Sequence, residues 1–186
     1  MHLPSYIRDV QTKASCLYTR QDIEVALDKM AKAMHARLAD QNPIFLCVMI
    51  GGLIPTGNLL PRLDFPLELD YIHATRYGGQ IRGGELQWLV KPRCNLQDRV
   101  VLIIDDILDG GITLHEIVKY CRSQGAKEVL TAVLLDKKEE RLPEGLSHAD
   151  FTGLSTQGGF VFGYGMDYKE YLRNAPGIYV VAPEHQ

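Results

Sequence analysis

Several kinds of segment are absent from this 186-residue sequence, and each absence excludes a class of protein. No apolar run approaches the roughly 18 residues that a membrane-spanning helix needs. The four cysteines form no C-x-x-C pair, which argues against a zinc site or a thioredoxin-like motif. The histidines show no metal-ligand spacing. There is no internal repeat, low-complexity tract or long linker, so we expect residues 1–186 to form a single domain.

A strong excess of charge of either sign is also lacking. The formal net charge is -3, and 46% hydrophobic with 23% charged residues is the profile of an ordinary globular protein. We therefore expect no nucleic-acid partner, because such proteins usually carry a basic surface. Residues 1–11 lack the apolar core of a signal peptide. Cys47 and Cys121 lie in apolar patterns, as reduced core cysteines do, so we expect a cytoplasmic protein. Without a long apolar run, we expect no membrane partner.

Hydrophobic periodicity predicts alternating helices and strands. The segment 100–136 is the most informative, because a buried strand, an acidic glycine-containing turn, a helix and a second buried strand follow one another. Such a unit implies parallel strands with a right-handed crossover, hence an α/β doubly wound fold with ligands at the carboxyl ends of its strands. The expected helices are 19–41, with Thr19 as N-cap, 54–60 and 112–124, and the expected strands are 44–50, 67–75, 85–91, 100–104 and 129–135.

The turn after the first of these two strands carries groups suited to a sugar phosphate. Asp105 and Asp106 end the strand, Asp109 follows, and glycines at 110–111 open the helix. A helix N-terminus behind glycines favours a phosphate, since its N–H groups are unpaired. The carboxylates suit sugar hydroxyls, or magnesium held through waters. A solvated loop or a helix N-cap is the alternative for each acid taken singly.

This string resembles the phosphoribosyl pyrophosphate motif of the type I phosphoribosyltransferases. It keeps Thr113 and departs at Gly110, where the motif usually has Thr. Further segments resemble the hypoxanthine-guanine branch of that family, although Ile50 stands where the first pyrophosphate loop often has Lys. The matching segments are 46–52, 134–137, 160–168 and 171–174.

The resemblance implies a mostly parallel twisted sheet flanked by helices, a small hood and a flexible hairpin lid. The lid would span 76–85, the hood about 150–186, and residues 1–18 would form an N-terminal extension. It also implies a homodimer or homotetramer. A static hairpin tip is the alternative for the glycine-rich lid.

The resemblance assigns roles around phosphoribosyl pyrophosphate. Asp105 and Asp106 would hold the ribose hydroxyls, and with Asp167 they would serve Mg²⁺. Asp109 would accept the proton from purine N7, and Tyr77 of the lid would help to close the reacting centre. The residues implied to bind phosphoribosyl pyrophosphate are Gly51, Gly52, Asp105, Asp106, Asp109, Gly110, Gly111, Ile112, Thr113 and Arg173.

The resemblance also assigns a purine site to four residues. Lys137 would donate to the 6-oxo group, Phe160 would stack on the ring, and Val161 and Asp167 would border it. From the residues alone, Lys137, Asp167 and Arg173 read equally well as surface charges, and 160–162 as a core strand.

The implied reaction is purine salvage: hypoxanthine or guanine plus phosphoribosyl pyrophosphate gives the nucleoside monophosphate and pyrophosphate. Three alternatives stay open. They are a phosphoribosyltransferase for xanthine, adenine or a pyrimidine, an RNA-binding regulator on the same fold, and a catalytically inactive interaction protein. The intact acids at 105, 106, 109 and 167 argue against the last.

Overall fold

A six-stranded sheet forms the body of the protein in the computed structural model, which describes residues 4–76 and 86–186. The strand order is β4-β3-β2-β5-β6-β7, and all neighbours are parallel except β3 and β4. This confirms the predicted α/β class with a mostly parallel sheet. The strands are β2 (Ile44–Val48), β3 (Glu68–Arg76), β4 (Leu86–Val90), β5 (Val100–Leu108), β6 (Glu128–Lys137) and β7 (Phe151–Thr156).

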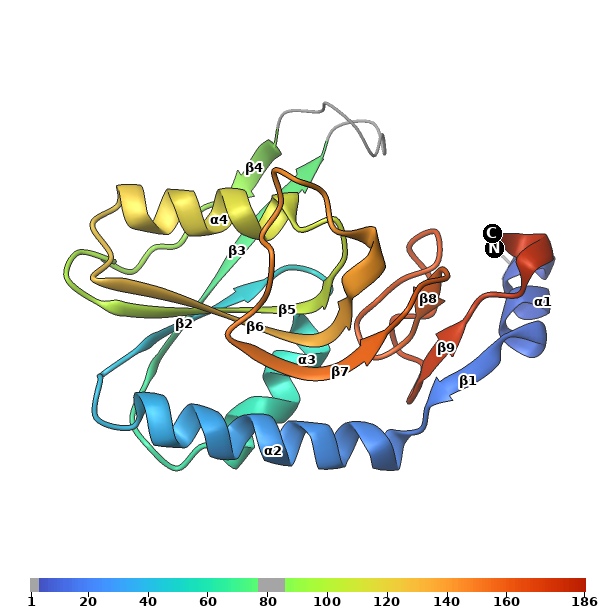
Figure 1. Cartoon of the computed structure of the whole chain (residues 1–186), viewed down its shortest axis with the longest axis horizontal. Helices are drawn as coiled ribbons and strands as arrows, with labels where there is room; N and C mark the ends of the chain where they lie inside the picture. Colours follow the sequence, from blue (N-terminus) through green and yellow to red (C-terminus); the bar gives the residue numbers. More distant parts are fainter. Residues whose placement is uncertain (1–3, 77–85) are drawn as a thin grey trace.

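Helices cover both faces of the sheet (Figure 1). The helix α4 (Ile112–Ser123) lies on one face, while α2 (Arg20–Leu38) and α3 (Leu53–Leu59) lie on the other. A 3-10 turn, η1 (Leu60–Arg62), follows α3, and another, η3 (Lys138–Glu140), follows β6. The two helical layers enclose two hydrophobic cores, one on each side of the sheet.

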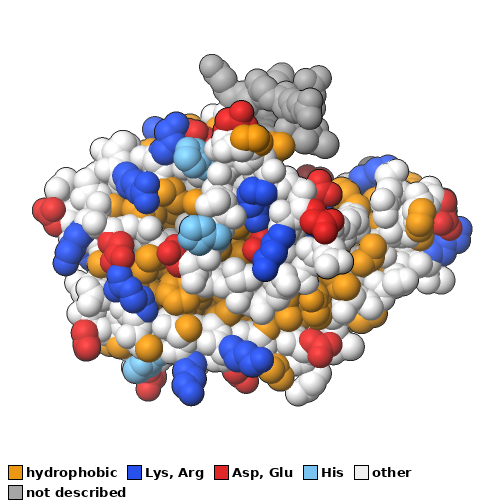
Figure 2. All heavy atoms as spheres, in the orientation of Figure 1, with side chains coloured by type: hydrophobic (Ala, Val, Ile, Leu, Met, Phe, Trp, Pro, Cys, Tyr) orange, Lys and Arg blue, Asp and Glu red, His pale blue; other side chains and the backbone are white. Residues whose placement is uncertain are grey.

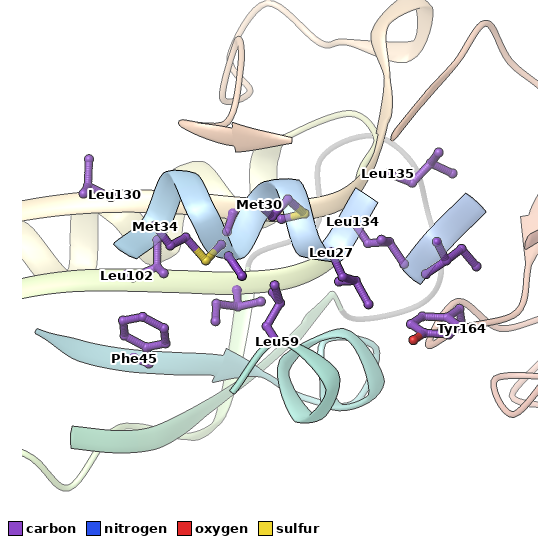
Figure 3. Packing of buried hydrophobic residues seen from close by; sticks show 14 of the residues in the cluster. Leu27, Met30, Met34, Phe45, Leu59, Leu102, Leu130, Leu134, Leu135 and Tyr164 are labelled. Atoms are coloured by element: carbon purple, nitrogen blue, oxygen red, sulfur yellow. The ribbon is translucent and has the colours of Figure 1, made fainter. Parts of the chain in front are cut away.

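Helix α2 begins at the predicted cap. The Thr19 side chain accepts from the Asp22 amide at 3.3 Å, and the Asp22 carboxylate accepts from the Thr19 amide at 2.9 Å. This reciprocal pair satisfies two amides that a helix start would leave unpaired. The apolar stripe predicted for this helix is buried, and Figure 3 shows its packing on the sheet: the residues labelled there include Leu27, Met30, Met34, Phe45, Leu102 and Leu134.

The strand that carries the acids is longer than predicted. We expected it to end at Ile104 with the acids in a turn, but β5 continues to Leu108, which pairs with Asp136 of β6. The prediction that Asp105 and Asp106 belong to the turn is therefore wrong. Because β6 also runs two residues past its predicted end, the parallel ladder continues through both acids.

A second, smaller sheet forms a hood beyond the carboxyl ends of β5 to β7 (Figure 1). Its antiparallel order is β1-β9-β8, and helix α1 (Ser5–Lys13) covers it. The buried Ile7 and Val10 of α1 pack in one cluster with Phe162 and Tyr168. The N-terminal segment, expected as an extension, thus joins the hood, whereas β7 belongs to the main sheet. The hood elements are β1 (Ser15–Tyr18), β8 (Val161–Phe162), β9 (Ile178–Val180) and η4 (Pro183–His185).

The surface and the cysteines complete the description. On the face drawn in Figure 2, side chains of both charge signs are interspersed over the sheet body. In the described part of the chain, no helix combines the length and the apolar character needed to cross a membrane. The four cysteines are free, and Cys47 and Cys121 are buried as predicted. Residues 77–85, which hold Tyr77 and most of the predicted lid, lie outside the described residues.

Candidate active site

A cleft of about 840 Å³ lies where β2, β5 and β6 end and the hood begins. Apart from Gly52 and the undescribed Tyr77, every residue predicted for the site lines it. Among the described lining residues, the cations are Lys137 and Arg173, while Ile50 is 44% exposed. The predicted residues that it brings together are Gly51, Asp105, Asp106, Asp109, Gly110, Gly111, Ile112, Thr113, Lys137, Phe160, Val161, Asp167 and Arg173.

Glycines allow three chain segments to meet at the base of the cleft. A Cβ at Gly51 would lie 2.1 Å from Asp106 Oδ2, and one at Gly165 would lie 2.2 Å from the Gly51 carbonyl oxygen. A Cβ at Gly52 would collide with the carbonyls of Ile104 and Val48, each 2.7 Å away. Gly51 therefore borders the cleft, whereas Gly52 seats the loop on the strands behind it.

The two neighbouring acids of β5, Asp105 and Asp106, lie where ionisation of both carboxyl groups is unfavourable. Burial raises the pKa of Asp105 well above its usual range, and the charge of Asp106 raises it further. Burial also raises the pKa of Asp106, while the Arg173 guanidinium opposes both shifts. The Asp106 amide donates to Asp105 Oδ1 at 2.9 Å, which fixes the orientation of that carboxylate. Such a pair gains from a nearby positive charge.

The loop between β5 and α4 forms a backbone cradle. Gly111 is the N-cap of α4, at φ +84, and no side chain caps the helix. The suggestion that Asp109 is the N-cap is therefore wrong. A Cβ at Gly110 would lie 3.2 Å from Leu142 Cδ1, so Leu142 occupies the space beside the position where the motif usually has Thr. The uncapped helix start is a ready anion site.

Lys137 and Asp109 face each other across the sheet side of the cleft. Lys137 ends β6 with a side chain only 9% exposed, and its Nζ lies 3.4 Å from Asp109 Oδ1. The reading of Lys137 as a solvated surface lysine is wrong, because this side chain is buried against the cleft. A cationic donor and an anionic acceptor thus stand side by side.

The hood supplies the opposite side of the cleft. Phe160 is 47% exposed and meets Tyr168 edge to face, with the ring centroids 5.7 Å apart. Val161, the next residue, is buried. Arg173 forms an ion pair with Asp167, at 2.8 Å from Oδ1, and donates to the Gly165 carbonyl at 2.9 Å, so a network within the hood fixes its guanidinium.

Sequence reasoning missed several residues at or behind the cleft. Met166, Glu140 and Leu142 line it, and Arg141 contacts the backbone of Asp109 from behind. No motif marks Arg141 in the sequence, because its partners come from β6 and from the loop before α4. Only the fold brings these segments together.

Comparison with known proteins decides the family. Residues 14–169 match the family model of the phosphoribosyl transferase domain. This chain belongs to the phosphoribosyltransferase family. The branch expected from the sequence is also confirmed, since its relatives include hypoxanthine-guanine phosphoribosyltransferases.

The relatives of this phosphoribosyltransferase match nearly its whole length. The hypoxanthine-guanine phosphoribosyltransferase of Bacillus subtilis (strain 168) is 32% identical over 168 residues, covering 90% of this chain and 92% of that protein. The hypoxanthine-guanine-xanthine phosphoribosyltransferase of Tritrichomonas foetus is 29% identical, with 87% and 88% covered. The bifunctional protein TilS/HprT of Listeria innocua is 32% identical over 90% of this chain, which spans 26% of that longer protein.

Solved structures agree with the fold of this phosphoribosyltransferase. A crystal structure of a hypoxanthine phosphoribosyltransferase from Staphylococcus aureus superposes with a TM-score of 0.87 at 26% identity, covering 98% of both chains. The hypoxanthine phosphoribosyl transferase of Trypanosoma cruzi gives 0.83 at 27% identity, with 91% and 92% covered.

Proposed function

We propose that this protein transfers the phosphoribosyl group of phosphoribosyl pyrophosphate to hypoxanthine or guanine. One observation carries the proposal: Lys137 Nζ and Asp109 Oδ1 lie 3.4 Å apart on one wall of the cleft. A 6-oxopurine presents the complementary pair, because its O6 accepts and its N7–H donates on the same edge of the ring. With its edge against both groups, the base would form two charge-assisted hydrogen bonds, one from Lys137 to O6 and one from N7–H to Asp109.

The sugar phosphate would bind beside that wall. The 5′-phosphate fits the uncapped start of α4 at 109–113, and the ribose hydroxyls fit the carboxylates of Asp105 and Asp106. Pyrophosphate would meet the backbone at Gly51 and the fork of Arg173, which suits phosphate oxygens. Since Ile50 brings no charge to this loop, we expect Arg173 to carry more of that contact.

Magnesium fits the donor set of the site. Asp105 and Asp106 offer hard oxygens whose raised pKa falls when a cation arrives, and Asp167 lines the same cleft. Within 4–76 and 86–186, no three or more His, Cys, Asp or Glu side chains gather to hold a metal unaided. Substrate oxygens and waters would therefore complete the coordination. Bound there, the metal would offset the charge of the leaving pyrophosphate.

The chain's own groups would then serve the transfer step. The bond between purine N9 and C1′ forms as the bond from C1′ to the pyrophosphate oxygen breaks, and the electron pair leaves with pyrophosphate. The N7 proton becomes acidic and passes to Asp109. Phe160 would hold the ring in plane by stacking while Lys137 fixes O6.

The assembly and the compartment are also proposals. We propose a homodimer or homotetramer; the Trypanosoma cruzi relative was studied for the role of its C-terminal region in oligomeric state and enzymatic activity. Because the four cysteines are free, we propose that the protein works in a reducing compartment such as the cytoplasm.

A turnover assay tests the proposed function. The protein is mixed with phosphoribosyl pyrophosphate, Mg²⁺ and each of hypoxanthine, guanine, xanthine and adenine, and nucleotide and pyrophosphate are quantified together. We expect stoichiometric formation of both products with hypoxanthine or guanine, and loss of turnover after exhaustive chelation that added Mg²⁺ restores. Turnover of none of the bases would contradict the proposal, and turnover unchanged by chelation would remove the metal from it.

A further inference from the structure

Arg141 lies behind the cradle loop, outside the cleft. Its guanidinium donates to the backbone carbonyl of Asp109, to the Asp136 carboxylate and, at 3.3 Å, to the carbonyl of Ser147. The side chains of Arg141 and Asp136 are only 14% and 8% exposed. A charge pair so removed from water is costly to break, because either partner alone leaves an uncompensated charge.

The segment around Arg141 also grips the cradle through its backbone. The Leu142 amide donates to the Gly110 carbonyl at 3.1 Å, and the Leu146 amide donates to the Gly111 carbonyl at 3.0 Å. The contact is close, because a Cβ at Gly111 would lie 2.7 Å from the carbonyl oxygen of Leu146. Together with the Arg141 contact, three successive carbonyls of the cradle are therefore held by the segment 141–146.

Holding those carbonyls fixes the amides on the other side. In a planar trans peptide, the carbonyl of one residue and the N–H of the next point in opposite directions. Carbonyls of 109–111 drawn toward 141–146 therefore aim the amides of 110–112 away from that segment. These three residues line the cleft. The cradle's donors are thus oriented by contacts that never touch a ligand.

We propose that Arg141, paired with Asp136, is a positioning residue that sets the cradle and Asp109 for catalysis. Asp136 immediately precedes Lys137 on β6, and Arg141 joins that strand end to the loop carrying Asp109. One guanidinium thereby fixes the relative placement of the two groups that would flank the purine edge. This inference rests on the proposed function for its kinetic part, whereas its phosphate-binding part stands without it.

The chain offers a matched control at the other end of the same strand. Arg37 pairs with Glu128, the first residue of β6, and the two side chains are 44% and 36% exposed. Arg37→Ala removes an arginine–carboxylate pair from β6 without approaching the cleft. Exposed pairs of this kind contribute little. We expect wild-type binding and turnover for this variant.

The test compares Arg141→Ala, Arg141→Lys and Asp136→Asn with Arg37→Ala. Calorimetry measures the binding of ribose 5-phosphate, which needs the cradle but neither purine nor turnover. We expect binding to weaken roughly 10- to 100-fold in Arg141→Ala, the effect of losing a charged contact. Arg141→Lys keeps a charge beside Asp136 but loses the fork to the Asp109 carbonyl, so we expect a folded variant with about a 3- to 10-fold loss.

Kinetics separate positioning from a merely structural role. We expect kcat to fall with the ribose 5-phosphate affinity while the KM for the purine changes little, and guanidinium ions to restore part of the turnover of Arg141→Ala. Wild-type affinity and kcat in folded Arg141→Lys and Asp136→Asn would overturn the proposal, as would an equal loss in Arg37→Ala. A wild-type protein that binds ribose 5-phosphate but turns over no base would fail the proposed function, and the binding comparison would still decide the role of Arg141.

Discussion

The two walls of the cleft are built in different ways. On the sheet wall, Asp105, Asp106 and Lys137 stand near the ends of β5 and β6, where a continuous parallel ladder sets their register. The hood wall is a loop that turns repeatedly through left-handed backbone: the non-glycine residues with positive φ there are Tyr164, Lys169, Glu170 and Leu172. The hood has an apolar cluster of its own under α1, while its residues Val161, Tyr164, Met166 and Ile178 pack in the core that α2 and the sheet enclose.

This difference indicates a division of labour between the walls. The ladder pairs Leu108 with Asp136, the residues just before Asp109 and Lys137, and so limits how far the proton acceptor and the oxo-group donor can move apart. A loop outside that ladder can adjust around a flat ring, as stacking requires. We therefore expect changes on the sheet wall to alter which base reacts and how fast, and changes in the hood to alter affinity for all bases alike.

Base selection offers the largest effect by which to test this comparison. The Lys137 ammonium is a donor only, and adenine presents an amino group where hypoxanthine presents an acceptor. A site built to bond a substrate group rejects an analogue lacking it by about 10,000-fold. We expect that ratio in kcat/KM between hypoxanthine and adenine, measured under the same conditions. Adenine within tenfold of hypoxanthine would remove Lys137 from base selection.

The hood offers the matching variant. Phe160→Leu keeps an apolar side chain but loses the aromatic face, which is half exposed toward the cleft. Aromatic pairs are worth about 0.5–1.5 kcal/mol beyond area burial, so we expect kcat/KM for hypoxanthine and guanine to fall about 2- to 12-fold. Both bases should fall by the same factor. A selective loss for one base would break the proposed division.

Proton transfer tests Asp109, which directly follows the last residue of β5. Asp109→Asn preserves shape but removes the acceptor, so we expect kcat to fall roughly 100- to 10,000-fold with binding of ribose 5-phosphate unchanged. The matched control is Asp40→Asn, at an exposed aspartate after α2, for which we expect wild-type kcat. Near wild-type turnover in folded Asp109→Asn would assign the proton to another group.

Local stability separates the two walls physically. Ile7 is 1% exposed in the hood cluster, so Ile7→Ala creates a cavity there and should cost about 2–5 kcal/mol of hood stability. Because Ile7 packs in the hood cluster and in neither core of the sheet, we expect faster hydrogen exchange at β8 and β9 with little change at β5 and β6. Equal acceleration in both regions would mean that hood and sheet unfold as one unit.

The sheet wall should also gain stability when one of its acids is removed. The folded pKa of Asp105 is raised, so ionisation at neutral pH opposes folding, and this penalty grows as pH rises from the unfolded pKa toward the folded one. At pH 7, Asp105→Asn should therefore raise the free energy of unfolding by about 0.5–2 kcal/mol, and this gain should shrink as the pH approaches 4. Denaturant titrations at both pH values measure it. A destabilised variant at pH 7 would contradict the strained-acid interpretation.

The sequence predicts the sheet wall better than the hood. The unit 100–136 could be predicted because local periodicity marks its buried strands and its helix, and glycines mark where that helix begins and ends. The length of β5 was underestimated because its last residues extend only by pairing with β6. The local sequence of β5 does not indicate this pairing.

The hood and the contacts of Arg141 could be predicted from the sequence only in part. The loop segment 160–168 was found through the family resemblance, but nothing local indicates that α1 covers it or that β1 pairs with β9. Arg141 was missed for the same reason. Its acceptors on Asp136 and Ser147 are neighbours in the sequence, but its contact with the Asp109 carbonyl, 32 residues away, forms only in the folded chain.

The pairing of β1 with β9 also sets an order of events during protein synthesis. Ser15 pairs with Val180, so one of the first strands to leave the ribosome waits for one made long afterwards. Domains generally fold as units during synthesis, and β2, β3, β5 and β6 all precede β9 in the chain. The sheet of the hood therefore cannot close until β9 has been made, after every strand beside the phosphate cradle. The stacking side of the purine site would therefore be completed last.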